Sequence, residues 1–301
     1  LLGLGALVGL FCGSASALFL HLLDRATSFR GAHRSIVFAL PLAGLALGVL
    51  YERFGKAIKG GNNLVIDTIH DDGPEIPLRM APMVLVGTVL THLFGGSAGR
   101  EGTAVQMGAS LADAIAHRIG VSSAVRRQLL AAGVAGGFGS VFGTPIAGTV
   151  FGLEFVSLGR IEYDALIPAL VAALVGDATT RAWGVGHTPY PATPSVALNP
   201  LLALKWLVFA AAVAAVSTAF IELTHWLKRQ GERRVPSLGV RMLLGGAAVV
   251  GLWQLSGTDN YLGLGVPTIV RAFEDPHLPV YAFAAKLLFT AITLGAGFLG
   301  G

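Results

Sequence analysis

Three long apolar stretches constrain the fold more than any other feature of this sequence. Residues 1–23, 201–224 and 280–301 contain almost no charged side chains, and each is longer than the ~20 residues that one membrane-spanning helix needs. Only 13% of the 301 residues are charged, against the ~25% usual in soluble domains. So few charges cannot cover a water-facing surface. The sequence therefore predicts an all-α polytopic membrane protein embedded in the lipid bilayer.

The remaining apolar runs do not fit a simple bundle of full spans. Residues 36–51, 81–96, 103–116 and 164–177 are short for a span, whereas 128–159 is too long for one helix. We expect this long run to break twice, at Gly136-Gly137 and at Thr144-Pro145. Membranes tolerate such breaks only where protein or an aqueous cavity satisfies the freed backbone groups. The pattern predicts tilted, broken and half-spanning helices.

Positive charge lies in the loops between the apolar runs. The net charge is +4, and the densest basic segment, residues 228–241, is predicted to face the cytoplasm by the positive-inside rule. This distribution orients a multi-pass protein in the inner or plasma membrane and does not indicate nucleic-acid binding. Lys205, Glu222 and Lys286 lie near the ends of apolar runs and are expected to extend to the membrane interface.

The sequence carries an internal repeat. Residues 38–66 correspond to 242–269, and residues 80–99 correspond to 282–301. Repeats with interrupted helices in matching positions are typical of transporters whose binding site lies between the repeats.

The repeat divides the chain into two parts. We expect residues 1–200 to form the first repeat and residues 201–301 to form the second, which is incomplete. The second copy ends where the first continues into Arg100-Glu101-Gly102. A C-terminal part of the parent protein is therefore expected to be missing.

A Gly-rich turn runs directly into a helical pattern at residues 95–119. Gly99 to Thr103 are predicted to form a helix N-terminus at membrane depth, where free N–H groups and the helix dipole favour an anion. Glu101 lies where that anion would bind, and an ionisable residue inside a membrane is costly enough to be a functional candidate. The simpler alternative is that Arg100 and Glu101 only cap a helix and pair at an interface.

Two further helix starts have the same character. Glycines precede Asn62 and Asn63, whose amides can cap a helix or donate to an anion, and capping is the simpler interpretation of this motif alone. Thr144 is a predicted N-cap, and Pro145 is the predicted first helical residue. Three helix N-termini in one apolar chain favour an anion pathway.

These motifs carry a resemblance to a known family. Gly-Arg-Glu-Gly at 99–102, Ala-Val-Gln-Met-Gly at 104–108 and Thr-Pro-Ile-Ala-Gly at 144–148 resemble the CLC family of chloride channels and anion/proton antiporters. The resemblance covers nearly the whole chain in order. It implies two inverted-topology repeats, a homodimer with one pathway per subunit, and Glu101 as the gating and proton-carrying glutamate. It also implies that the anion binds at Gly99, Arg100, Gly102, Thr103, Asn62, Asn63 and Leu64.

The sequence departs from the chloride-handling members of this family at three places. Thr103 stands where they have proline, and Gly-Gly-Asn-Asn-Leu at 60–64 replaces their Gly-Ser-Gly-Ile-Pro, so the chloride-coordinating serine is not matched. Phe155 occupies the position of their internal proton-accepting glutamate, directly after Glu154. This combination is similar to the fluoride/proton antiporter branch, and it implies fluoride export in exchange for protons.

Other functions stay open from the sequence. A chloride/proton antiporter and a passive CLC-type chloride channel would use the same site. An intramembrane serine hydrolase is a weaker alternative: Gly95-x-Ser97-x-Gly99 matches a nucleophile elbow, with His92 or His225 as its base, but no strand is predicted before the serine. No cofactor or metal is predicted, because the sequence contains no phosphate loop or metal-ligand cluster.

Overall fold

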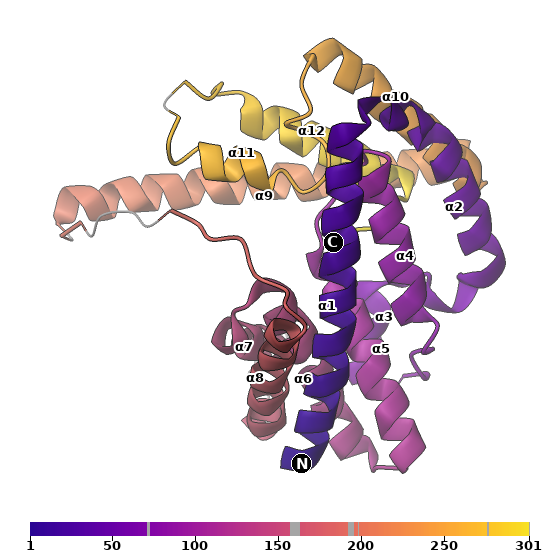
Figure 1. Cartoon of the computed structure of the whole chain (residues 1–301), viewed down its shortest axis with the longest axis vertical. Helices are drawn as coiled ribbons and strands as arrows, with labels where there is room; N and C mark the ends of the chain where they lie inside the picture. Colours follow the sequence, from indigo (N-terminus) through magenta and orange to yellow (C-terminus); the bar gives the residue numbers. More distant parts are fainter. Residues whose placement is uncertain (71–72, 157–162, 192–195, 198, 276, 301) are drawn as a thin grey trace.

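The computed structural model describes residues 1–70, 73–156, 163–191, 196–197, 199–275 and 277–300. Every regular element in these residues is a helix (Figure 1). In chain order the elements are α1 (Leu2–Ala32), η1 (Arg34–Ala39), α2 (Leu40–Phe54), η2 (Lys56–Ile58), α3 (Asn62–His70), α4 (Met80–Leu93), α5 (Glu101–Ile119), α6 (Ser123–Phe142), α7 (Pro145–Val156), η3 (Tyr163–Ala165), α8 (Leu166–Ala182), α9 (Pro200–Arg234), α10 (Leu238–Ser256), α11 (Val266–Arg271) and α12 (Ala282–Ala296).

The described residues contain both full spans and shorter apolar helices. Five segments are long and apolar enough to cross a membrane, namely Leu2–Ala32, Arg34–Phe54, Tyr163–Ala182, Pro200–Arg234 and Leu238–Ser256. The helices α4, α7 and α12 are apolar but shorter than a full span. The prediction of an all-α, multi-pass membrane protein with half-spanning helices is confirmed.

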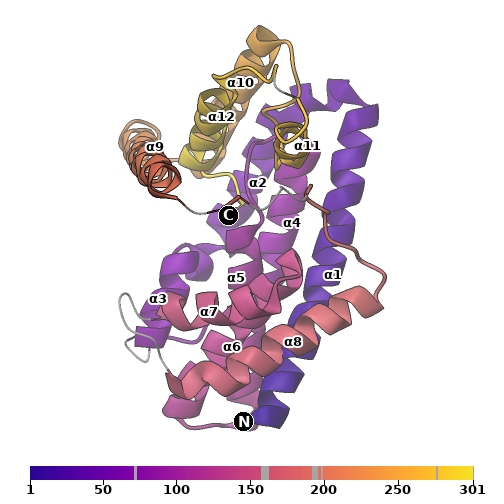
Figure 2. The same ribbon diagram turned by 90° about the vertical axis from the view of Figure 1, so that its left-hand side faces the viewer.

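The chain forms two groups of helices joined along α1. Figure 1 shows α5 to α8 around the lower half of α1 and α10 to α12 near its upper end. Figure 2 shows α9 standing beside α12, on which it chiefly packs. None of the residues of α9 is buried within the described structure. Most of the buried apolar residues instead come from α1 and from α3 to α8.

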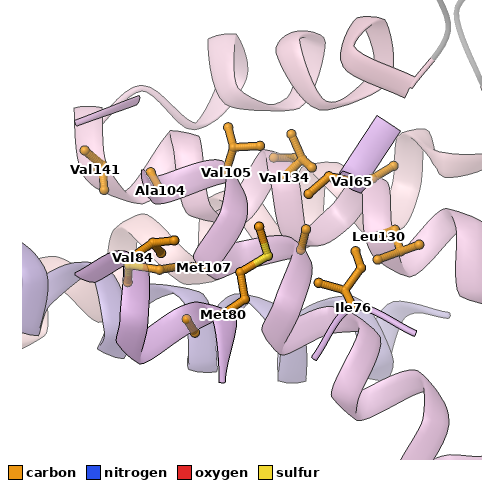
Figure 3. Packing of buried hydrophobic residues seen from close by; sticks show 14 of the residues in the cluster. Val65, Ile76, Met80, Val84, Ala104, Val105, Met107, Leu130, Val134 and Val141 are labelled. Atoms are coloured by element: carbon orange, nitrogen blue, oxygen red, sulfur yellow. The ribbon is translucent and has the colours of Figure 1, made fainter. Parts of the chain in front are cut away.

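Apolar side chains from α1 and from α3 to α8 form one buried core. Figure 3 shows Val65 of α3, Val84 of α4, Val105 of α5 and Val134 of α6 in one cluster. All four are at most 2% exposed. Because this core joins α3 to α5, it fixes the relative positions of two of the predicted helix starts.

One of the two breaks predicted for residues 128–159 is wrong. Helix α6 continues through Gly136 and Gly137, and the chain turns only at Gly143, whose φ of 68° is left-handed. Helix α7 then begins at Pro145, as predicted. Gly137 serves packing instead, since a Cβ there would overlap the carbonyl oxygen of Ala104 on α5. Small residues allow membrane helices to approach this closely.

Helices α2 and α10, which correspond in the predicted repeats, pack against each other in opposite directions. Gly48 lies against Gly239, and Gly246 lies against Pro41. Residue numbers thus fall along α2 as they rise along α10. An inverted-topology repeat brings equivalent helices together in this antiparallel way. The division at residue 200 stays a prediction.

Candidate anion site

Helix α5 begins at Glu101, and Arg100 is its N-cap. The Glu101 carboxylate folds back over the helix start, where Oε2 accepts a hydrogen bond of 2.8 Å from the backbone N–H of Arg100. Gly102 and Thr103 are buried, whereas the Glu101 side chain is exposed. The predicted helix N-terminus at residues 99–103 is confirmed. The carboxylate takes one of the backbone donors that such a terminus offers to an anion.

Arg100 is directed toward the next helix start. Its guanidinium carbon lies 5.0 Å from the ring centroid of Phe142, a distance within the range of a cation–π contact. Phe142 is the last residue of α6 and directly precedes the turn into α7. In the described residues Arg100 forms no ion pair with the Glu101 carboxylate. The start of α5 therefore lies beside the start of α7.

A side-chain hydrogen bond connects the start of α3 to α5. Asn62 is the first residue of α3, and its Oδ1 accepts a hydrogen bond of 3.0 Å from Nε2 of Gln106 on α5. Within the described part of the chain the Asn62 amide nitrogen makes no hydrogen bond, so it is free to donate. Asn63 is exposed and Leu64 is half-buried. The structure thus joins the start of α3 to α5 at Gln106, one turn beyond Thr103.

Thr103 forms a polar pair that the sequence did not reveal. Its Oγ1 lies 2.6 Å from Oγ1 of Thr88 on α4, and both side chains are buried. One of the two hydroxyl hydrogens makes this bond. The other hydroxyl hydrogen makes no hydrogen bond to the described residues, so the pair retains one donor.

Near the end of α7 the apolar side chain of Phe155 follows Glu154. Phe155 is half-buried and its ring centroid lies 5.4 Å from that of Phe151. Glu154 is exposed. The Phe155 side chain thus packs against another aromatic ring and, being apolar, cannot carry a proton.

A cavity of about 680 Å³ lies beside Arg100. Arg30, in the last turn of α1, and Arg34, the first residue of η1, also line it. Residues between 184 and 188 and between 259 and 268 also line the cavity. Arginines at positions 30 and 34, shortly after the first apolar run, were a signal for this cavity that sequence reasoning missed. Because three arginines outnumber the two carboxylates that line the cavity, Asp24 and Asp259, its excess positive charge concentrates anions there.

Asp259 holds the rim of the cavity in place. Its Oδ2 lies 2.7 Å from Nε of Arg34, and its Oδ1 accepts a hydrogen bond of 2.7 Å from Nε1 of Trp253. Partial burial opposes ionisation of this carboxyl, but the hydrogen bonds from Arg34 and Trp253 outweigh it and lower the pKa of Asp259. Asp259 therefore stays ionised at neutral pH.

The expectation that Lys286 extends to the membrane interface is wrong. Its Nζ donates to Oγ of Ser97 at 2.8 Å and to the carbonyl oxygen of Tyr261 at 3.2 Å. It also donates to the carbonyl oxygen of Gly263. Lys205 and Glu222, in contrast, are exposed on α9.

The hydrogen bonds of His92 and Ser97 argue against a serine hydrolase. The two ring nitrogens of His92 lie 2.8 Å and 3.0 Å from the carbonyl oxygens of Thr88 and Ala98. Oγ of Ser97 lies 2.8 Å from Oγ1 of Thr290 and accepts from Lys286. The described residues contain no hydrogen bond between His92 and Ser97. The nucleophile–base pair that a hydrolase requires is therefore not formed.

Comparisons with known proteins identify the family of this chain. Residues 43–301 match the family model described as voltage gated chloride channel. The chain is 45% identical, over its whole length and 68% of the relative, to the "Chloride/fluoride channel protein" of Pseudomonas syringae pv. tomato. It is also similar to the crystal structure of a CLC-type fluoride/proton antiporter, with a TM-score of 0.95 and 35% identity over 99% of this chain and 75% of that chain.

A more distant likeness extends to chloride transporters. The crystal structure of a slow cyanobacterial Cl⁻/H⁺ antiporter matches with a TM-score of 0.82 over 100% of this chain and 74% of that chain, at 21% identity. This likeness shows the fold alone. With the matching family model and the 45% identical relative, the chain belongs to the voltage-gated chloride channel family as a CLC-type fluoride or chloride channel or antiporter and not an enzyme.

Proposed function

We propose that this protein exports fluoride in exchange for protons. The observation that carries the proposal is the Glu101 carboxylate, which accepts the backbone N–H of Arg100 at the start of α5. Two relatives support the choice of ions, since one is a chloride/fluoride channel protein and the other a fluoride/proton antiporter. Phe155 also supports it, because the position of an internal proton glutamate is apolar.

Glu101 couples the two ions in this proposal. When ionised, its carboxylate occupies the donors at the start of α5 and closes the outer entrance. When protonated, it leaves these donors, and an anion from the cavity beside Arg100 takes its place. Proton binding and anion binding are thereby linked, so that the gradient of either ion drives the other.

The donors around this site suit a small anion. Fluoride holds its hydration water strongly, so a site must replace that water with several hydrogen-bond donors. The backbone at Gly99 and Gly102, the free hydroxyl of the Thr88–Thr103 pair and the Asn62 amide nitrogen supply such donors. Asn63 and Leu64 complete the proposed site at the start of α3. Arg100 adds positive charge at its outer side.

Two features of the assembly also belong to the proposal. Residues 1–200 and 201–301 form the two inverted repeats, and two copies of the chain form a homodimer with one pathway in each subunit. The antiparallel packing of α2 on α10 supports the inverted repeats. The homodimer follows from the family resemblance.

Proton-driven fluoride movement tests the role of Glu101. Purified protein in liposomes is given a proton gradient, and fluoride movement is followed with an ion-selective electrode. Glu101→Gln keeps the size and hydrogen bonding of the side chain but cannot titrate, so we expect it to lose proton-driven fluoride movement. Glu154→Gln is the matched control and should retain coupling. Proton movement that stays coupled to fluoride in Glu101→Gln would disprove the mechanism.

Ion choice requires a separate measurement on the same liposomes. We expect fluoride efflux to exceed chloride efflux by at least about tenfold. Equal efflux of the two anions would favour a chloride/proton antiporter instead. A reversal potential set by the anion gradient alone, without influence of the proton gradient, would indicate a passive channel.

A further inference from the structure

Lys286 places a positive charge between the two groups of helices. Its ammonium group has three N–H donors, and three neutral oxygens accept them: Oγ of Ser97 and the carbonyl oxygens of Tyr261 and Gly263. All three donors are therefore used. Gly265 lies against the end of the lysine side chain, where a Cβ would come within 3.1 Å of Cε.

No acidic side chain neutralises this ammonium group. In the part of the chain that the structure describes, Lys286 forms no ion pair with a carboxylate. The nearby Arg30 donates to the carbonyl oxygen of His92, and its guanidinium lies against Gly263. A cation held only by neutral oxygens in a low-dielectric region is costly, and its field reaches further than it would in water. A mobile anion close by would offset that cost.

The same contacts fix the loop that leads to Glu101. Ser97 is fully buried, and its backbone N–H donates to Oγ1 of Thr293 at 3.1 Å, while its Oγ lies 2.8 Å from Oγ1 of Thr290. Lys286 and both threonines belong to α12. The loop before α5 is thus held by a helix from the second part of the chain. Four residues of extended backbone reach at most about 14 Å, so Ser97 lies within that distance of Glu101.

We propose that Lys286 is a positioning residue of the anion pathway, which holds the loop before Glu101 through Ser97 and strengthens anion binding at the start of α5 with its positive charge. This inference rests on the proposed function, in which the anion binds at that helix start. It assigns to the second repeat a direct influence on the site formed by the first. The carbonyl oxygens of Tyr261 and Gly263 and Oγ of Ser97 keep the charge in place.

Substitutions that separate charge from hydrogen bonding test this role. The initial rate of fluoride movement into liposomes is measured against fluoride concentration for wild type, Lys286→Met, Lys286→Gln and Lys286→Arg. We expect the apparent KM for fluoride to rise about fourfold or more in the Met and Gln variants, as a unit charge within about 20 Å implies at an effective dielectric constant of about 20. Lys286→Arg should restore KM to within twofold. Lys205→Met, at an exposed lysine of α9, is the matched control.

Each outcome supports or overturns the proposed role of Lys286. If Lys286→Gln keeps the wild-type KM, hydrogen bonding alone suffices and the role of the charge is overturned. If only the amount of folded protein falls while KM is unchanged in Lys286→Gln and Lys286→Arg, Lys286 serves folding and the proposal is wrong. Where Lys286→Met does not fold, the Gln and Arg variants still decide. A failure of the antiport proposal is recognised separately, as wild-type protein whose fluoride movement ignores the proton gradient.

Discussion

At the scale of single residues, Asp113 is the buried charge with the fullest set of partners. Its Oδ1 accepts from Nε of Arg126 at 2.6 Å, and its Oδ2 accepts from the backbone N–H of Ile76 at 2.7 Å. These bonds tie α5, α6 and the segment before α4 together. Asp113 is fully buried, so the geometry of the pair is protected from water.

We expect Asp113→Asn to destabilise the protein strongly. Removing one partner of a buried ion pair costs about 3–5 kcal/mol, because the other charge is left without compensation. The midpoint of thermal unfolding in detergent, read from intrinsic fluorescence, measures the effect. Asp164→Asn, at an exposed carboxylate, should unfold within about one degree of wild type. Equal stability of the two variants would contradict this account of Asp113.

The ion pair between Arg34 and Asp259 is expected to make a small contribution to stability that depends on pH. Because the pKa of Asp259 is lowered, the stability it contributes is present above the unfolded value of about 3.9 and is lost as pH falls through the folded pKa. The contribution is small, since both side chains stay largely exposed. Unfolding midpoints of wild type and Asp259→Asn should therefore differ slightly and equally at pH 5 and pH 8. The difference should shrink as the pH falls below about 3.9, and a difference that grows toward acid pH would refute this expectation.

At the scale of helices, close packing of α5 on α6 sets the position of the anion site. A Cβ on Gly137 would overlap the carbonyl oxygen of Ala104, one turn after Glu101. We expect Gly137→Ala to separate the two helices, lower the unfolding midpoint and slow fluoride movement by at least about tenfold. Gly251→Ala on α10 is the control, because nothing lies within 4 Å of its added Cβ. That variant should match wild type in both measurements.

The sequence was sufficient for the helix starts but not for their packing. Helix α3 begins at Asn62, α5 at Glu101 and α7 at Pro145, each within one residue of the predicted start. These starts could be predicted because capping residues, glycine and proline act locally. A break was predicted at Gly136-Gly137 because a glycine that permits close helix packing has the same neighbours in sequence as a glycine that ends a helix. The partners of Lys286 lie 25 and 189 residues away in the chain. Only the folded chain brings them together.

At the scale of the whole molecule, the inverted repeats make a prediction about sidedness. If residues 201–301 repeat the first half in inverted orientation, α1 and α9 begin on opposite faces of the membrane. The basic segment 228–241, which covers the C-terminal end of α9 and the start of α10, faces the cytoplasm by the positive-inside rule, so the start of α9 faces outward and the start of α1 faces inward. Antiparallel packing of Gly48 on Gly239 requires the same relation between α2 and α10.

Labelling of single cysteines from outside the cell tests this arrangement. The native Cys12 is buried and does not interfere. Gly3→Cys lies at the start of α1, Val196→Cys precedes α9 and Arg233→Cys lies at its end, and all three positions are exposed. A membrane-impermeant maleimide applied to intact cells should label Val196→Cys alone, and should label the other two only after lysis. Labelling of both Gly3→Cys and Val196→Cys in intact cells would place α1 and α9 in the same orientation, and the repeats would then be parallel rather than inverted.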